Sequence, residues 1–340
     1  MPLKSFRHWG FVRAILLPGA SVLAAFLVTG LLAWIAGADP LRAFYVIGEG
    51  AFGNLYVTGS TLVKATTLSL TGLAVGFAYR AGLLNIGAEG QLQMGAAASA
   101  ATAIYVPAPG PLLMILSVAA GFVAGAAWSG IAGVLRAVFK SNEIVTTLML
   151  NYIALLIVGY LVTGPMVAKG ATFRTSERIP AAAELPILLS GTPVHAGLLI
   201  AIAAAVLIWL LLNRTTIGFV LQAMGYNPLA VRSMGWPVNR LIVIAMTISG
   251  GLAGLAGAGE VLGVHHRLLD GFSPGYGYLA IGVTFLASHN PFWTLASGVF
   301  FGAGITGVSY LQRALQVPSS IMFVVQGLLI IFMATGAALT

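Results

Sequence analysis

The sequence has no cysteine and little charge. None of its 340 residues is cysteine, which excludes disulfide bonds and thiolate metal sites. Only 7% of the residues are charged, whereas a soluble domain carries roughly 25%. So few charged side chains cannot cover a globular surface with solvated groups. Because 59% of the residues are hydrophobic, we expect the surface to face lipid and predict an all-α, polytopic membrane protein.

The sequence also lacks a nucleotide-binding motif and a recognisable catalytic centre. It contains no G-x-x-x-x-G-K-[ST] phosphate loop, so nucleotide held in that way belongs to a separate subunit. The five histidines have no spacing that gathers metal ligands, and no nucleophile–base arrangement is visible. The net charge of +8 comes from scattered basic residues without an aromatic platform. We therefore expect a transport subunit with no enzymatic activity, metal, cofactor or nucleic-acid partner of its own.

Ten apolar segments are candidate membrane spans, since a span needs about 20 largely apolar residues. The first follows Lys4, Arg7 and Arg13 and exceeds the roughly 7–15 apolar residues of a signal peptide, so we interpret it as a retained helix. Together the segments predict one permease domain over residues 1–340. They cover residues 14–37, 57–79, 82–105, 111–135, 144–164, 194–212, 241–264, a short 278–288, 292–310 and 318–337.

The distribution of Lys and Arg predicts the orientation. With the N-terminus placed inside, nine basic residues fall on the cytoplasmic side and six outside, three of the six in one long loop. This excess is the one expected of cytoplasmic loops. Both termini are therefore predicted to be cytoplasmic. The long loop 165–193 is then external, and the loop 213–240 is cytoplasmic.

Polar residues in apolar segments are candidate functional groups, because an ionised side chain at the bilayer centre costs roughly 2.5–3.5 kcal/mol. Asn85, Glu89 and Gln91 follow one another in a glycine-interrupted stretch. On a helix, Asn85 and Glu89 share one face. The stretch is either a pore or gate segment or a place where Glu89 ties helices together through buried hydrogen bonds.

Two further charged residues lie in predicted spans. Glu260 follows a run of small residues from Ser249 that favours close helix packing, and it is expected to pair with His265, His266 or Arg267. Lys64 either extends to the outer interface or pairs with a buried acid such as Glu89.

The loop 213–240 is predicted to hold two short helices. Apolar residues recur at helical spacing around 217–224, and a stop follows at Gly225. Asn227 and Pro228 resemble an N-cap followed by proline at the first helical position, so a second helix is predicted over about 228–234, ending at Gly235. Two helices along the membrane face would form a rigid surface for a partner.

Four segments resemble the permease subunits of ATP-binding-cassette importers for simple sugars and nucleosides. They occur in the family's order and are Ala81–Gln91 (AGLLNIGAEGQ), Asn142–Tyr152 (NEIVTTLMLNY), Gln222–Arg232 (QAMGYNPLAVR) and Gly271–Tyr278 (GFSPGYGY). Nucleoside importers of the basic-membrane-lipoprotein type look more similar than ribose-type importers. One departure is Gln222, which stands where related loops often carry a basic residue.

The resemblance implies a ten-helix permease in the bacterial cytoplasmic (inner) membrane. Its partners would be membrane lipid, a homologous permease or a second copy of the chain, two ATPase subunits that bind ATP–Mg, and an extracytoplasmic solute-binding protein. The translocation path would include Asn85, Glu89, Gln91 and Asn151. Coupling to the ATPase would use Gln222, Gly225, Asn227, Pro228, Arg232 and Gly235. The alternatives are an ion- or proton-coupled secondary transporter that uses Glu89 and Glu260, and a permease for branched-chain amino acids.

Overall fold

The computed structural model describes residues 39–315 apart from Ala171, together with isolated positions at 27, 28, 30, 31, 34 and 327. The predicted spans 14–37 and 318–337, and the orientation of both termini, lie outside the described residues. Within them the secondary structure is helical, with three isolated β-bridges and no named strand.

Six helices of the described region are long and apolar enough to cross a membrane. They match six of the predicted spans: α3 (Leu55–Arg80), α5 (Gly110–Phe139), α6 (Glu143–Thr163), α7 (Gly197–Arg214), α10 (Val238–Glu260) with the π-helical turn η2 (Val261–His265), and α12 (Pro291–Leu315). The short predicted span 278–288 is α11 (Tyr276–Leu286). α3 is central, since 89% of its apolar window is buried. Only 22% of the window of α6 is buried, so this helix presents most of its surface outward.

The span predicted over 82–105 begins too early. Its helix is α4 (Ala88–Tyr105), and residues 82–87 are not helical. Gly82 has φ +75°, a left-handed conformation that favours glycine, and it turns the chain directly after α3. Asn85 therefore precedes the helix, and the expectation that it shares a helical face with Glu89 is wrong.

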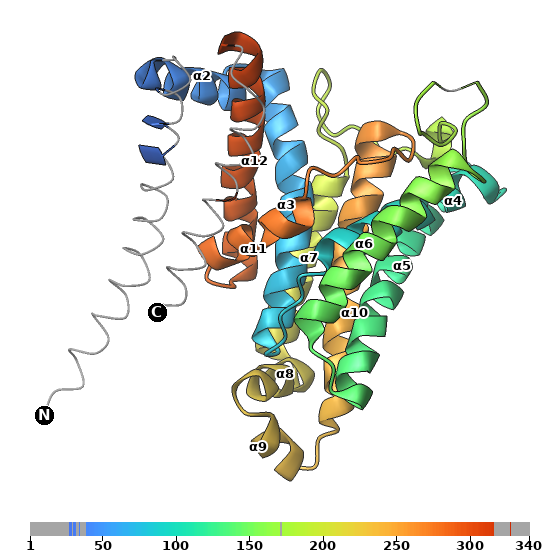
Figure 1. The fold of residues 1–340 in the computed structure, drawn as a ribbon, viewed down its shortest axis with the longest axis vertical. Coiled ribbons are helices and arrows are strands. Elements are labelled where there is room, and N and C mark those ends of the chain that lie inside the picture. The colour runs from blue at the N-terminus through green and yellow to red at the C-terminus, as the bar shows by residue number, and fades with distance from the viewer. Residues whose placement is uncertain are drawn as a thin grey trace, which may run out of the picture.

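A helix that the apolar runs of the sequence do not predict lies before α3. α2 (Pro40–Phe52) begins at an Asp39 N-cap, whose carboxylate accepts a hydrogen bond from Leu41 N at 2.9 Å. α2 is too short to span a bilayer. It packs against α12, where a side chain on Gly50 would collide with Tyr310. Figure 1 shows it lying across the top of α3 and α12.

The centre of the bundle is held by helices that approach almost to backbone contact. α10 packs on α5, α4 and α3, and a β-carbon on Gly254 would collide with the carbonyl oxygen of Gly121. Gly125 meets Gly250 and Gly254 in the same way, and Gly95 of α4 meets Gly254 from another side. These contacts confirm that the small residues of 249–260 serve close helix packing.

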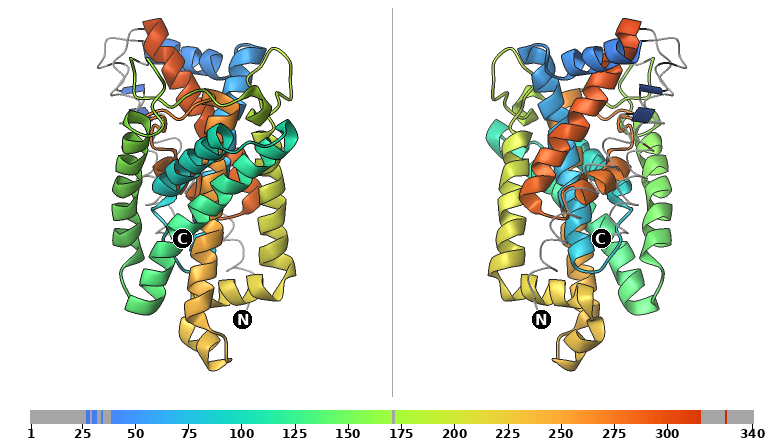
Figure 2. Two further views of the ribbon diagram at one scale, coloured as in Figure 1. Left: turned by 90° about the vertical axis from the view of Figure 1, so that its right-hand side faces the viewer. Right: turned by 90° about the vertical axis from the view of Figure 1, so that its left-hand side faces the viewer.

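The two ends of the bundle differ. At one end α8 (Thr216–Tyr226) lies across the bundle and α9 (Pro228–Ser233) projects beyond the long helices; we call this the α9 end. They confirm the two helices predicted in 213–240. The opposite, loop end carries α2 and the segment 164–196, which includes the 3₁₀ turn η1 (Ala181–Ala183) (Figures 1 and 2).

The segment 164–196 is fixed to the chain that follows α10. Ser176 N donates to Leu268 O at 2.9 Å, and Leu185 N donates to Leu262 O at 2.8 Å. The Arg174–Asp270 ion pair at 3.3 Å adds a partly exposed contact. Two segments far apart in sequence thereby form one wall at the loop end.

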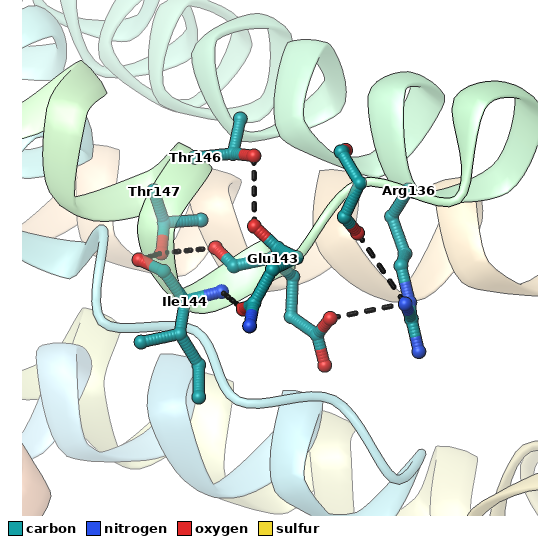
Figure 3. A network of polar contacts seen from close by, with 7 residues as sticks. Arg136, Glu143, Ile144, Thr146 and Thr147 are labelled. Carbon is teal, nitrogen blue, oxygen red and sulfur yellow. Dashed lines mark hydrogen bonds and ion pairs between the residues drawn. The ribbon is translucent and has the colours of Figure 1, made fainter.

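A polar turn joins α5 to α6 at the α9 end of the bundle (Figures 2 and 3). Arg136 Nε lies 3.1 Å from a carboxylate oxygen of Glu143, and Thr146 Oγ1 donates to Asn142 O at 2.8 Å. Asn142 Oδ1 accepts from Ile144 N at 2.9 Å, which caps α6. The second of the four recognised segments therefore starts at a helix N-terminus.

Candidate functional site

The non-helical residues 82–87 lie in a buried polar cluster with the beginning of α4. Asn85 Nδ2 donates to Ser249 Oγ of α10 at 2.8 Å, and Ser249 in turn donates to Ala74 O of α3 at 2.7 Å. The side-chain amides of Asn85 and Gln91 also bond to each other at 2.9 Å. All three side chains are buried. Residues 82–87, which we call the interrupted segment, are thus held by hydrogen bonds to α3 and α10.

Asn151 fastens the same segment to α6 and α11. Its Oδ1 accepts from Gly90 N at 2.8 Å, while its Nδ2 donates to Ile86 O at 3.0 Å and to the Tyr278 hydroxyl at 3.2 Å. The backbone N–H of Gly90 and the carbonyl of Ile86 are therefore hydrogen-bonded to the side chain of Asn151 instead of to other backbone groups of a helix. Such pairing is what permits irregular backbone at membrane depth.

We expect replacement of Asn151 by leucine to lower the free energy of unfolding by about 2–4 kcal/mol, because two buried backbone groups lose their partner. Thermal unfolding in detergent measures the change. Thr146→Ala on the same helix removes only a hydroxyl bonded within its own turn and should cost less than about 0.5 kcal/mol. Equal effects of the two variants would contradict this prediction.

Glu89 lies where two helix N-termini meet. It is in the first turn of α4, and its Oε2 accepts from Gly277 N of α11 at 2.8 Å. Helix N-termini favour a negative charge. A β-carbon on Gly277 would collide with the backbone of Glu89, so glycine is needed for this approach. The recognised segments 81–91 and 271–278 are thereby brought into contact.

The structure thus gathers the four predicted path residues, Asn85, Glu89, Gln91 and Asn151, into one cluster that joins α4, α6, α10 and α11. Their role in translocation stays a prediction. Sequence reasoning missed Ser249 and Tyr278 as members. Ser249 lies within the small-residue run, and Tyr278 ends a recognised motif, but nothing in either pattern indicates which polar group it bonds.

A cavity of about 1000 Å³ opens near the loop end. Its wall includes Lys64 of α3, Glu260 at the end of α10, His265 of η2, Ser273 and the first residue of α11, Tyr276. Asn85, Glu89, Gln91 and Asn151 do not line it. Glu260 pairs with His265, whose Nε2 lies 3.3 Å from its carboxylate, which confirms one of the three partners expected for this acid. Within the described residues Lys64 makes no ion pair within 4 Å, so it is not paired with Glu89 or another buried acid there. It lines the cavity near the loop end, and its extension to the outer interface stays a prediction.

At the α9 end, α8 meets the turn that follows α3. A β-carbon on Gly82 would lie 2.7 Å from Gly225 Cα, and one on Gly225 would lie 2.6 Å from Arg80 O. Both positions therefore need glycine. The predicted coupling residue Gly225 directly touches the start of the interrupted segment.

Arg80 joins three parts of the chain at this end. Its Nη1 donates to Gln222 Oε1 of α8 at 2.9 Å, and its Nε donates to His289 O between α11 and α12 at 3.3 Å. Gln222 Nε2 also donates to Leu212 O at 2.7 Å. A basic side chain at 222 would place a like charge beside Arg80, which gives a physical reason for glutamine at this position.

The remaining predicted coupling residues form the tip of the α9 end. Asn227 Oδ1 accepts from Leu229 N and Ala230 N, which confirms the N-cap of α9, and Pro228 is the first helical residue. Arg232 is exposed on α9. Gly235 has φ +85° and turns the chain after this helix. Their contact with an ATPase stays a prediction.

His289, which follows α11 near the α9 end, is held neutral. Its ring stacks on Tyr79 with centroids 4.0 Å apart. Burial lowers the pKa of His289 from its usual 6.5 to about 4, and the charge of Arg80 acts in the same direction.

A pH effect on stability follows from this lowered pKa. Below about pH 6.5 the unfolded chain takes up a proton that folded His289 does not, so stability falls as the pH drops towards 4. Replacing His289 by asparagine, which tolerates the φ of 59°, removes this contribution. We expect the fall in melting temperature between pH 7 and pH 4.5 to shrink by roughly 2–5 °C in the variant. An unchanged pH dependence would refute a neutral His289.

Comparison with known proteins defines the class. The family model described as "Branched-chain amino acid transport system / permease component" matches residues 57–334. The glucose ABC transporter permease protein TsgB13 of Haloferax volcanii is 36% identical, over 94% of this chain and 87% of the relative. The guanosine ABC transporter permease protein NupP of Bacillus subtilis is 31% identical, over 96% and 94%. A second B. subtilis protein, the guanosine ABC transporter permease protein NupQ, is 28% identical, over 82% and 91%. No solved structure matches.

The helices and these relatives define a multi-pass membrane protein that serves as the permease subunit of an ABC importer. It is a transport component, and ATP hydrolysis takes place in a separate subunit. The chain belongs to the family of branched-chain amino acid transport system permease components.

Proposed function

We propose that this chain forms, with a second permease of the same family, the path by which an ABC importer takes up a nucleoside or a simple sugar. The observation that carries the proposal is the similarity to permeases named for glucose and guanosine, which extends over 94% and 96% of the chain. B. subtilis contributes two matching guanosine permeases, and this supports a pore built from two related subunits.

The α9 end is proposed to face the cytoplasm and to bind one of two ATPase subunits that carry ATP–Mg. Its surface supports this: Tyr226 is 93% exposed, and the apolar residues Leu229 and Met234 are also largely exposed. Exposed apolar groups on a rigid element are typical of a protein interface. Asn227 and Pro228 would shape this surface, and Gly225 and Gln222 would transmit its movement to α3.

The loop end is proposed to receive solute from an extracytoplasmic binding protein, in the cytoplasmic membrane of a bacterium. Its ordered wall of 164–196 against 262–270 offers a defined docking surface, and the cavity opens beside it. Asn85, Glu89, Gln91 and Asn151 would lie deeper on the path. The cluster that they form would move as a unit when Gly225 shifts against Gly82.

Reconstitution tests the proposal. The full chain is placed in proteoliposomes with a candidate second permease, ATPase and binding protein from the same organism, and uptake of labelled guanosine, glucose and leucine is measured. We expect ATP-dependent uptake of guanosine or glucose that requires every component. A matched control replaces the ATPase by a variant that binds but does not hydrolyse ATP.

Two outcomes would overturn the proposal. Uptake of leucine alone would make the chain a branched-chain amino acid permease. Uptake by this chain without the ATPase, driven by a pH gradient and lost in Glu89→Gln, would make it a secondary transporter.

A further inference from the structure

A lysine of α3, Lys64, lines the cavity at the loop end. Lys64 lies ten residues into α3, within a helix that otherwise carries a charge only at Arg80. Among the described residues it makes no ion pair within 4 Å and no hydrogen bond, although its side chain lines the cavity. A charged group at such a depth persists where water or a ligand reaches it. Lys64 therefore brings an ammonium group with three N–H donors to the cavity wall.

A carboxylate on the same wall is held in place by the protein. Glu260 is buried, with 3% of its surface exposed. One oxygen accepts from Thr67 Oγ1 of α3 at 2.5 Å, and the other lies 3.3 Å from His265 Nε2. Each carboxylate oxygen can accept a further hydrogen bond. Glu260 therefore offers fixed acceptors on the wall that Lys64 lines.

The other residues of the cavity wall limit which class of ligand can bind there. Glu184, the second acid of the wall, is already in contact with Arg178 at 3.2 Å and His266 at 3.6 Å. Tyr56, Phe272 and Tyr276 add aromatic surface, and Ser60 and Ser273 add hydroxyls. An anion would be repelled by Glu260 and a cation by Lys64, whereas a neutral hydroxyl group both donates and accepts. A volume of about 1000 Å³ is at the upper end of ordinary ligand pockets, and it leaves room for water.

We propose that Lys64 and Glu260 form a contact site for the transported solute in this cavity, and that the site takes a neutral solute with neighbouring hydroxyl groups. Lys64 donates to one hydroxyl and Glu260 accepts from the next, through charge-assisted hydrogen bonds. The inference deepens the proposed function and rests on it. It names the residues that meet the solute after the binding protein releases it.

Because the chain has no cysteine, a single introduced thiol can be labelled specifically to test the site. Ser60→Cys introduces the chain's single thiol on the cavity wall, in the reconstituted complex, and labelling by a membrane-impermeant thiol reagent is followed on this chain. We expect labelling from the loop end, slowed about tenfold by guanosine or glucose at ten times its dissociation constant. Thr58→Cys is the matched control. Its hydroxyl, like that of Ser60, donates to the carbonyl oxygen four residues earlier, but Thr58 lies outside the cavity wall.

The contributions of Lys64 and Glu260 are tested by adding substitutions to the Ser60→Cys variant. Lys64→Met and Glu260→Gln should each reduce the protection by solute, whereas Lys169→Met removes an exposed charge of the 164–196 segment and should leave it unchanged. If Ser60→Cys fails to accumulate, Tyr56→Cys on the same wall replaces it.

The outcomes separate this inference from the proposed function. ATP-dependent uptake without protection of either thiol, or protection that survives both Lys64→Met and Glu260→Gln, would overturn the site and leave the importer in place. A thiol that no reagent reaches from the loop end would also overturn it. Absence of ATP-dependent uptake would overturn the proposed function itself.

Discussion

Replacement of Arg80 by alanine is expected to lower solute uptake about tenfold while ATP hydrolysis by the assembled importer continues. Arg80 ends α3, the most buried of the long helices, and bonds to Gln222 of α8 and to His289 O before α12. If α8 moves during the ATPase cycle as proposed, its movement would then no longer be transmitted to α3 and α12 through this side chain. Hydrogen bonds to a charged group contribute about 1.5–3 kcal/mol, and coupling energies of about 1–3 kcal/mol correspond to 5–150-fold effects.

The measurement compares uptake with ATP hydrolysis in proteoliposomes, as solute moved per ATP. Arg80→Lys keeps the charge but has all its donors on one nitrogen instead of the guanidinium fork that reaches Gln222 and His289, so it should restore part of the ratio. Arg214→Ala is the control. It removes a cation at the same end, whose side chain contacts the Trp209 ring at 5.7 Å. A loss of hydrolysis in parallel with uptake would show that Arg80 supports folding or assembly instead of coupling.

Replacement of Gly254 by alanine should destabilise the protein by about 3 kcal/mol or more. The added methyl group would collide with the carbonyl oxygen of Gly121 and press against Gly125 Cα at 3.1 Å. Both neighbours are backbone atoms, so no side-chain rotation relieves the overlap, and α5 must move away from α10. Overpacking of this kind costs about 1–3 kcal/mol and occasionally more. Separation of the helices would also loosen α4, which meets Gly254 through Gly95.

The same substitution at Gly304 of α12 provides the matched control. A β-carbon there meets no atom within 4 Å, and alanine is favoured over glycine within a helix by roughly 0.5–1 kcal/mol. In thermal unfolding in detergent, the melting temperature should therefore fall for Gly254→Ala and stay the same or rise for Gly304→Ala. Equal melting temperatures for the two variants would contradict the close contact of α5 and α10.

Much of the helical framework of the described region could be predicted from single segments. The long apolar runs of α5, α6, α7 and α12 are visible without tertiary information, because burial in lipid requires only length and composition. Asn227 followed by Pro228 predicted the start of α9 correctly, since capping is a local interaction. Close packing at Gly250 and Gly254 was indicated by the spacing of small residues.

Other features could not be predicted in this way. The stretch 82–87 is apolar enough to continue a helix, but Asn151 bonds to the backbone oxygen of Ile86, and Ser249 and Gln91 hold the side chain of Asn85. Helical spacing placed Asn85 beside Glu89, whereas Asn85 bonds across the bundle. α2 escaped detection because a short helix at the membrane surface lacks a 20-residue apolar run.

The sequence by itself determined that the chain is a helical membrane protein of the ABC permease type, because composition, apolar length and local motifs are properties of neighbouring residues. Tertiary structure alone decided which polar groups meet. It brought Arg80 to Gln222, 142 residues apart, and Glu260 to Thr67, 193 residues apart. Buried polar groups need partners, and only the packing of α3, α8 and α10 fixes which distant residue supplies each one.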